Sequence, residues 1–331
     1  MERFKSLEQA LFTSTINDGN FEKIALSLFH LQASENKVYR DYLTHLGVRP
    51  TRIKHTRDIP FLPISFFKNH DVVTGKWVGQ STFVSSSTTG ATPGRHKIRD
   101  LKFYFANARS VFERFYGGLE NFHFLALLPS YLERGNSSLV AMLDYFIKES
   151  KSAHSGFYLY DRSLLYKKLD ALRGDVRKVM LWGVSFALMD MAEETEIDLS
   201  HCIVMETGGM KGRREEITRA ELHELLCRRF NLTSVHSEYG MTELLTQAYS
   251  YGKGYFQLPP WMKMVAREVN DPFAEVADGR TGGLNVIDLA NTHSCAFIET
   301  QDLGLVVQGV NFEVLGRLDN SDVRGCNLLV K

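Results

Sequence analysis

The chain has 331 residues, of which 44% are apolar and 24% are charged, so it can bury a full core as one large domain or two moderate ones. Lysine plus arginine and aspartate plus glutamate both number 39, and this zero net charge excludes a global attraction to nucleic acid or to an anionic membrane. The sequence shows no apolar run of bilayer length and no C-x-x-C pair, which predicts a cytoplasmic protein with reduced thiols at Cys202, Cys227, Cys295 and Cys326.

Residues 1–82 are predicted to form a helical cap followed by an extended segment. Apolar residues recur at three- and four-residue steps in 6–12 and 21–43, which indicates amphipathic helices. The stretch DIPFLPISFFKNH, residues 58–70, contains Pro60 and Pro63. These prolines prevent a regular helix and favour an extended segment packed on the main domain.

Residues 83–278 alternate between strand and helix patterns, and a β-rich subdomain follows at 279–331. The alternation predicts an α/β sheet with helices on its faces, in which ligands lie at the carboxyl ends of strands. After Gly279, short strands punctuated by glycine indicate the β-rich part. The predicted strands of the α/β core are 81–84, 122–129, 178–184 and 201–207, and its predicted helices are 100–116, 137–150 and 219–230.

A hydroxyl-rich loop, FVSSSTTGATPGRHKI at residues 83–98, opens this core. A strand that ends in Ser, Thr and Gly before a helix brings backbone N–H groups, hydroxyls and a helix N-terminus together, which suits phosphate oxygens. The loop does not fit the Walker A pattern, because Gly90 and Gly94 have the wrong spacing and Lys97 comes late. Alone, such a loop is more often a turn than a phosphate site, so it needs corroboration.

Later segments provide that corroboration, and they occur in a fixed order along the chain. Together with the hydroxyl-rich loop they resemble, in order and spacing, the core motifs of the adenylate-forming (acyl-adenylate, AMP-binding) superfamily, and YGMTE is the most specific of them. The resemblance implies that superfamily's N-terminal domain architecture, with ATP and Mg²⁺ as cofactors. The segments are METGGMKG (205–212), SEYGMTELL (237–245), ETQDLGLVV (299–307) and GRLDNSDVRG (316–325).

The resemblance also implies a role for each motif residue. Tyr239 would stack on adenine, Thr242 would bond the α-phosphate, and Glu243 would bind Mg²⁺. Asp302 would accept hydrogen bonds from the ribose hydroxyls, and Arg317 would reach the ribose and phosphates. The other implied nucleotide-binding positions, in the phosphate loop and at glycines, are Ser85, Ser86, Ser87, Thr88, Thr89, Gly90, Gly208, Gly209 and Gly240.

Plain alternatives exist for these residues when each is taken singly. Tyr239 could be a buried aromatic, and Thr242 could cap a helix with Glu243 in its first turn. Asp302 could form a turn, and Arg317 could belong to a surface ion pair. As an ordered set, they favour ATP binding.

The sequence departs from the superfamily pattern at several places. Ser87 and Gln301 stand where glycine is usual, and 91–94 lacks the usual lysine, which leaves Arg95 or Lys97 as replacement cations. The chain ends at residue 331, which leads us to expect that the mobile C-terminal domain and its catalytic lysine are absent.

One short branch of the superfamily, the LuxE-type acyl-protein synthetases, resembles this chain in its helical N-terminus, in IPFLPISFFKNH and in the ending VRGCNLLVK. That resemblance implies activation of a fatty acid as acyl-AMP and transfer of the acyl group to a protein cysteine as a thioester. An acyl reductase or acyl-carrier protein would be the partner, with no nucleic acid and no membrane span. Cys326 matches the acceptor cysteine and would be catalytic together with Glu243 and Thr242, and Arg324 could lower its pKa.

Two other functions stay open at this point. One is an aryl- or acyl-CoA ligase related to the phenylacetate-CoA ligases, with its C-terminal domain provided by another chain. The other is a degenerate nucleotide-binding scaffold that has lost turnover, which Ser87 and Gln301 would suit.

Overall fold

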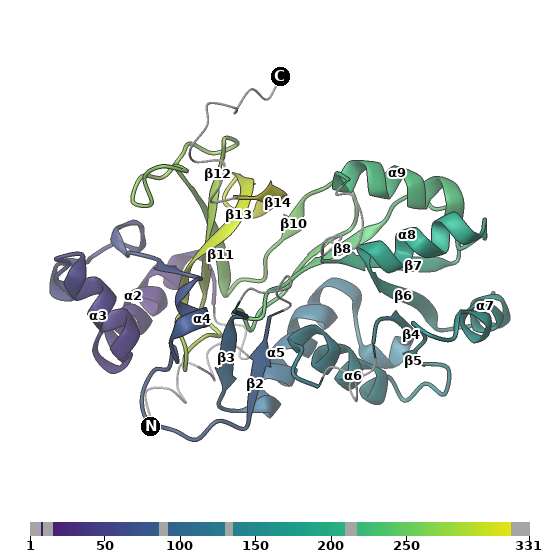
Figure 1. The fold of residues 1–331 in the computed structure, drawn as a ribbon, viewed down its shortest axis with the longest axis horizontal. Coiled ribbons are helices and arrows are strands. Elements are labelled where there is room, and N and C mark those ends of the chain that lie inside the picture. Colours follow the sequence, from purple (N-terminus) through teal and green to yellow (C-terminus); the bar gives the residue numbers. More distant parts are fainter. Residues whose placement is uncertain (1–7, 9–15, 86–91, 130–134, 209–216, 319–331) are drawn as a thin grey trace.

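The structure is a computed structural model that describes residues 8, 16–85, 92–129, 135–208 and 217–318. It confirms the predicted α/β class. One mixed, twelve-stranded sheet runs in the order β11-β12-β13-β14-β10-β9-β8-β7-β6-β4-β5, and β1 pairs with β13 beside this path. Helices α2 and α3 lie at one end of the molecule, and α5 to α9 surround the other half of the sheet (Figure 1). Among the described helices, none combines the length and apolar character that crossing a bilayer requires.

Two helices between residues 18 and 45 confirm the periodicity of 21–43, whereas the predicted helix at 6–12 lies outside the described residues except for residue 8. Asn17 caps the first helix by accepting the N–H groups of Gly19 (3.0 Å) and Asn20 (3.2 Å), and the Asn20 side chain accepts the N–H of Asn17 (2.9 Å). The prediction that 58–70 is extended throughout is partly wrong, because a helical turn begins beyond Pro63, where proline no longer interferes. The elements are α2 (Asp18–Glu35), α3 (Lys37–His45), η1 (Pro50–Arg52), η2 (Thr56–Asp58), β1 (Leu62–Pro63) and α4 (Phe66–Asn69).

The hydroxyl-rich loop joins two strands of a hairpin. Strand β2 (Ser81–Val84) pairs antiparallel with β3 (Arg95–Ile98), and the next helix, α5 (Leu101–Tyr116), begins only after the Asp100 cap. The prediction that a helix follows the loop directly is therefore wrong, because β3 stands between the loop and α5. Buried and solvent-facing residues alternate along β3 with the strand period of two, over only four residues.

The parallel half of the sheet contains the strands that the sequence predicts as continuous apolar runs. β4, β6, β7 and β8 pair in parallel, and every residue of β4 is buried, which explains the absence of alternation. Helices α7 and α8 join the predicted α5, α6 and α9. The bounds are β4 (Phe122–Leu127), α6 (Ser138–Ser150), β5 (Gly156–Phe157), α7 (Arg162–Ala171), β6 (Lys178–Val184), α8 (Ser185–Glu194), β7 (Cys202–Thr207), α9 (Arg219–Phe230) and β8 (His236–Tyr239).

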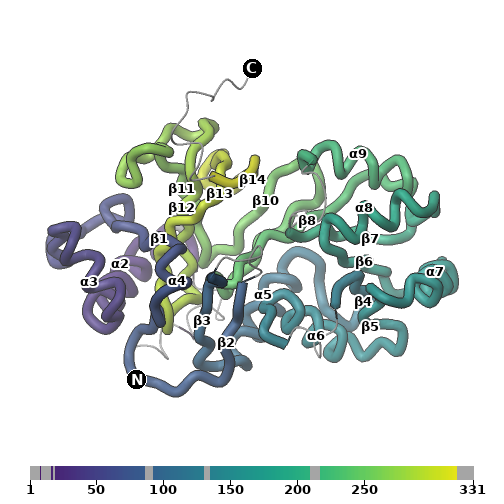
Figure 2. Tube along the Cα trace, in the orientation of Figure 1, coloured from purple at the N-terminus to yellow at the C-terminus, as the bar shows by residue number. Residues whose placement is uncertain are grey.

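The C-terminal part consists of antiparallel strands as predicted, but β13 is one strand of 11 residues where the glycine pattern predicts two short ones. Strand β10 pairs with both β9 and β14, so this part and the parallel half share one sheet, and the chain path of Figure 2 shows β10 lying between them. The domain boundaries at 82/83 and 278/279 stay a prediction. The bounds are β9 (Ala248–Ser250), β10 (Phe256–Gln257), β11 (Met262–Arg267), β12 (Thr281–Asp288), β13 (Phe297–Val307) and β14 (Asn311–Arg317).

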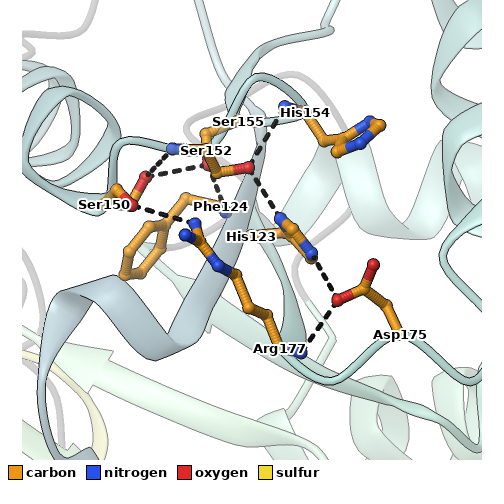
Figure 3. A network of polar contacts seen from close by, with 8 residues as sticks. All are labelled: His123, Phe124, Ser150, Ser152, His154, Ser155, Asp175 and Arg177. Carbon is orange, nitrogen blue, oxygen red and sulfur yellow. Dashed lines mark hydrogen bonds and ion pairs between the residues drawn. The ribbon is translucent and has the colours of Figure 1, made fainter.

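A polar network closes the amino-end edge of the parallel strands (Figure 3). His123 Nδ1 lies 2.6 Å from Ser152 Oγ, and His123 Nε2 lies 3.2 Å from Asp175 Oδ1. Although this series has the order of a nucleophilic triad, Ser152 Oγ also accepts the N–H of His154 (3.1 Å) and so closes the loop between α6 and β5. We interpret the network as a structural tie at the edge opposite to Tyr239, which ends β8.

Candidate active site

Tyr239, Asp302 and Arg317 meet where β8, β13 and β14 approach one another. Asp302 and Arg317 are direct cross-strand partners, with 3.7 Å between Arg317 Nε and Asp302 Oδ1. Tyr239 donates its hydroxyl proton to Asp302 Oδ2 at 2.8 Å. Burial raises the pKa of Asp302, and the Tyr239 hydrogen bond and the Arg317 charge act in the opposite direction. The structure thus brings together predicted residues that lie far apart in the sequence.

The Tyr239 ring packs among aromatic side chains. Its centroid lies 5.1 Å from that of Phe312, edge-on, and 5.8 Å from that of Phe256. Burial raises the pKa of Tyr239 well above its usual value, so the hydroxyl stays a neutral donor to Asp302. The ring is buried, as one of the plain alternatives holds, and adenine stacking stays a prediction.

The two ends of the hydroxyl-rich loop meet beside Glu243. Ser85 N donates to Gly94 O at 2.9 Å, and Gly94 N donates to Ser85 Oγ at 2.7 Å. A Cβ placed on Gly94 would overlap with the Glu243 carboxylate, so the chain passes directly against this side chain. The loop's predicted phosphate contacts at residues 86–90 lie outside the described residues, as do Gly209 and Cys326.

Glu243 is a buried carboxyl, with 5% of its surface exposed. Burial raises its pKa to about 7, and the nearby charge of Asp302 acts in the same direction, whereas Arg317 and Lys68 act to lower it. Among the described residues no group of three or more His, Cys, Asp and Glu side chains could hold a metal alone. A buried carboxylate fits Mg²⁺ that takes its other ligands from phosphates and water.

The turn that carries Thr242 and Glu243 is held from several elements. The His96 ring nitrogen Nδ1 donates to Thr242 O (2.9 Å), and Asn291 Nδ2 donates to Glu243 O (2.8 Å). Just after the turn, Asp288 Oδ2 accepts the backbone N–H groups of residues 245 (2.9 Å) and 246 (3.0 Å). Both motif residues lie in a turn outside any helix, which excludes the N-cap alternative. We did not predict these three supports, and the available signal was polar residues inside apolar strand patterns.

His96 makes a testable contribution to stability. Burial lowers its pKa to about 4, below the usual 6.5, so the unfolded chain takes up this proton more readily between these pH values. The contribution is therefore complete above pH 6.5 and is lost as the pH falls toward 4. The His96→Asn variant keeps an amide donor but does not titrate. Between neutral pH and pH 4, we expect its free energy of unfolding to fall by less than that of the parent, with a difference on the order of 3 kcal/mol.

Urea unfolding of the parent and the His96→Asn variant at pH 7 and at pH 4.5 measures this difference. An unchanged pH dependence in the variant would show that another group titrates in this range.

The predicted glycines satisfy local backbone demands. Gly208 has a φ of +69°, a left-handed conformation that favours glycine, and Ser185 donates its hydroxyl to the Gly208 carbonyl. At Gly240 a Cβ would collide with the Glu238 carboxylate. Both positions therefore have a structural reason for glycine, and their contact with a nucleotide stays a prediction.

Comparison with known proteins places these features in context. Residues 179–331 match the family model described as acyl-protein synthetase, LuxE. Over 344 residues the chain is 24% identical to the long-chain-fatty-acid–luciferin-component ligase of Aliivibrio fischeri, covering 93% of this chain and 86% of that protein.

Solved structures share the fold. A 2-hydroxyisobutyryl-CoA ligase in complex with 2-HIB-AMP and CoA superposes with a TM-score of 0.66 at 13% identity, covering 92% of this chain and 69% of that one. ATP-bound MatB from Rhodopseudomonas palustris gives a TM-score of 0.51 at 16% identity and covers 71% of this chain. The chain spans about half the length of MatB, 47%. These likenesses confirm the predicted fold architecture.

Proposed function

We propose that this chain activates a fatty acid with ATP and passes the acyl group to a protein cysteine. The proposal starts from the similarity of the chain to the LuxE acyl-protein synthetases of the adenylate-forming superfamily. The observation that carries the proposal is the meeting of the hydroxyl-rich loop with the buried Glu243 carboxylate at Gly94. The Aliivibrio relative is named as a ligase of a long-chain fatty acid, which supports the choice of acid.

The first step makes the acyl adenylate. A carboxylate oxygen of the acid forms a bond to the α-phosphorus of ATP, the bond from that phosphorus to the bridging oxygen breaks, and pyrophosphate leaves with the electron pair. In this proposal Thr242 bonds the α-phosphate, Asp302 holds the ribose, and Glu243 holds the metal. When bound, Mg²⁺ neutralises charge on the phosphates. Residues 85–90 orient the departing phosphates.

The second step moves the acyl group to Cys326. Its thiolate attacks the acyl carbon, the bond from that carbon to the phosphate oxygen breaks, and AMP leaves. The cysteines among the described residues suit this role poorly, because burial raises the pKa of Cys202 and of Cys295 to about 12 and also raises that of Cys227. Transfer onward to an acyl reductase or carrier partner belongs to the same proposal.

Intact-protein mass spectrometry after incubation with ATP, Mg²⁺ and a mixture of fatty acids tests the proposal. We expect a mass increase of one acyl group that hydroxylamine removes, together with acid-dependent release of pyrophosphate. Acylation of added CoA without a protein adduct would support the acyl-CoA ligase alternative. If no carboxylic acid elicits pyrophosphate release, the degenerate scaffold is the better description.

Tyr239 supports adenine binding in this proposal. Tyr239→Ala should weaken ATP binding by ~1–3 kcal/mol, the range for the loss of one aromatic stacking platform. Tyr239→Phe should weaken ATP binding much less, because this variant keeps the ring and loses only the hydrogen bond to Asp302. Calorimetric titration with ATP measures both, and thermal melting checks that each variant folds. Binding by Tyr239→Ala equal to that of the parent would remove Tyr239 from the adenine site.

A further inference from the structure

The charges around Glu243 are out of balance. Glu243 and Asp302 bring two acidic groups to the site, and Arg317, the cation on β14, is 73% exposed and pairs with Asp302. Arg219, whose charge also reaches Asp302, pairs with Glu206 (3.3 Å). A carboxylate substrate and a triphosphate would add further negative charge. The proposed reaction therefore calls for another cation close to Glu243.

Arg95 and Lys97, the cations on strand β3 of the hairpin, do not provide this additional charge. Strand β3 alternates, with His96 and residue 98 buried and with Arg95 and Lys97 on the other face. His96 is the residue that faces the Glu243 turn, since its ring bonds Thr242 O. Lys97 instead forms an ion pair with Asp71 at 2.7 Å. The prediction that one of these cations replaces the superfamily's loop lysine is thus not favoured by their positions.

Helix α4 brings a different lysine to the turn. Phe67 is completely buried, and its ring lies edge-on to His96 with 5.7 Å between centroids. Because His96 bonds Thr242 O, α4 is anchored to the turn that carries Glu243. Figure 1 shows α4 beside β3, the strand that carries His96.

Lys68 follows Phe67 directly and is partly buried. Within the part of the chain that the structure describes, its ammonium makes no hydrogen bond or ion pair. Burial raises the pKa of the Glu243 carboxyl, and the Lys68 charge acts in the opposite direction. Lys68 is therefore a cation on the helix that Phe67 and His96 anchor to the Glu243 turn, and it is not committed to a partner among the described residues.

We propose that the Lys68 ammonium binds an oxyanion of the reacting pair, either the carboxylate of the acid or the α-phosphate of ATP, and offsets charge as the two join. This inference rests on the proposed function. Lys68 donates hydrogen bonds and takes part in no bond that forms or breaks, so the balance of the adenylation step is unchanged. A positive charge held where negative charge develops lowers the barrier to the reaction.

Acid-dependent exchange of labelled pyrophosphate into ATP tests Lys68. We expect Lys68→Met and Lys68→Gln to lower kcat/KM by about 100-fold or more, the usual loss when one charge-stabilising donor is removed. Lys68→Arg should recover part of the loss, because it restores the charge. Lys37→Met, on the exposed surface of α3 where Lys37 pairs with Asp41, is the matched control and should exchange like the parent.

Two further measurements identify the oxyanion. A raised KM for the acid with an unchanged Kd for ATP assigns Lys68 to the carboxylate, and a weakened Kd for ATP assigns it to the phosphate. Thermal melting of each variant shows whether it is folded. Two neutral variants are used so that the test still stands if one of them does not fold.

The inference is overturned if folded Lys68→Met and Lys68→Gln exchange like the parent, or if Lys97→Met loses exchange while they do not. Absence of exchange in the parent would instead overturn the proposed function.

Discussion

Replacing Glu243 by Gln should abolish acid-dependent pyrophosphate release, with a fall of about 100-fold or more, while the protein stays folded. The amide has nearly the same shape but no charge, so it is a poorer Mg²⁺ ligand. The contacts that hold the turn reach its backbone, from His96 to Thr242 O and from Asn291 to Glu243 O, and the substitution leaves them in place. Pyrophosphate release over a range of Mg²⁺ concentrations is the measurement.

Glu299→Gln is a matched control for this variant. Burial raises the pKa of Glu299 as well, but its carboxylate pairs with Arg267 (3.2 Å) and has no role in the proposed site. Pyrophosphate release by Glu299→Gln should stay near that of the parent, apart from any loss of folded protein. Unchanged release by Glu243→Gln would refute the metal role of the YGMTE motif.

Replacing Cys326 by Ser should separate activation from transfer. The variant should still make acyl-AMP and pyrophosphate, because Glu243 and the nucleotide contacts are intact. It should lose the hydroxylamine-sensitive acyl adduct completely, because a hydroxyl is a far weaker nucleophile than a thiolate near neutral pH. Mass spectrometry of the intact protein and of its peptides measures both products.

Cys227→Ser is the control for the thiol. Cys227 lies on α9 with its pKa raised by burial, so its replacement should leave the adduct unchanged. An adduct that persists in Cys326→Ser and maps to another residue contradicts the assignment. If the parent acylates CoA efficiently and never forms an adduct, the CoA ligase reaction replaces acyl transfer to Cys326.

The hydroxyl-rich loop shows where local pattern was insufficient. Four strand residues, Arg95–Ile98, are too few to display a clear period beside so many loop-forming residues, and the helix pattern that follows is strong. The prediction therefore joined the loop to α5. The hairpin forms because β2 provides the hydrogen-bonding partner, from Ser81 paired with Ile98 to Val84 paired with Arg95. Pairing of this kind is a property of both strands together.

The sequence by itself determined the alternation of strands and helices and the order of the motifs, because periodicity, caps and turn residues act over a few neighbouring positions. It also indicated Tyr239, Asp302 and Arg317 as one set, through a resemblance rather than through geometry. Only the tertiary structure decided which side chains support them. His96 and Asp288 bond the Glu243 turn from β3 and β12, α4 packs on His96 through Phe67, and no spacing in the chain encodes that meeting. The physical reason is that strand register and helix packing set which face of each element points inward, and these depend on residues far away in the chain.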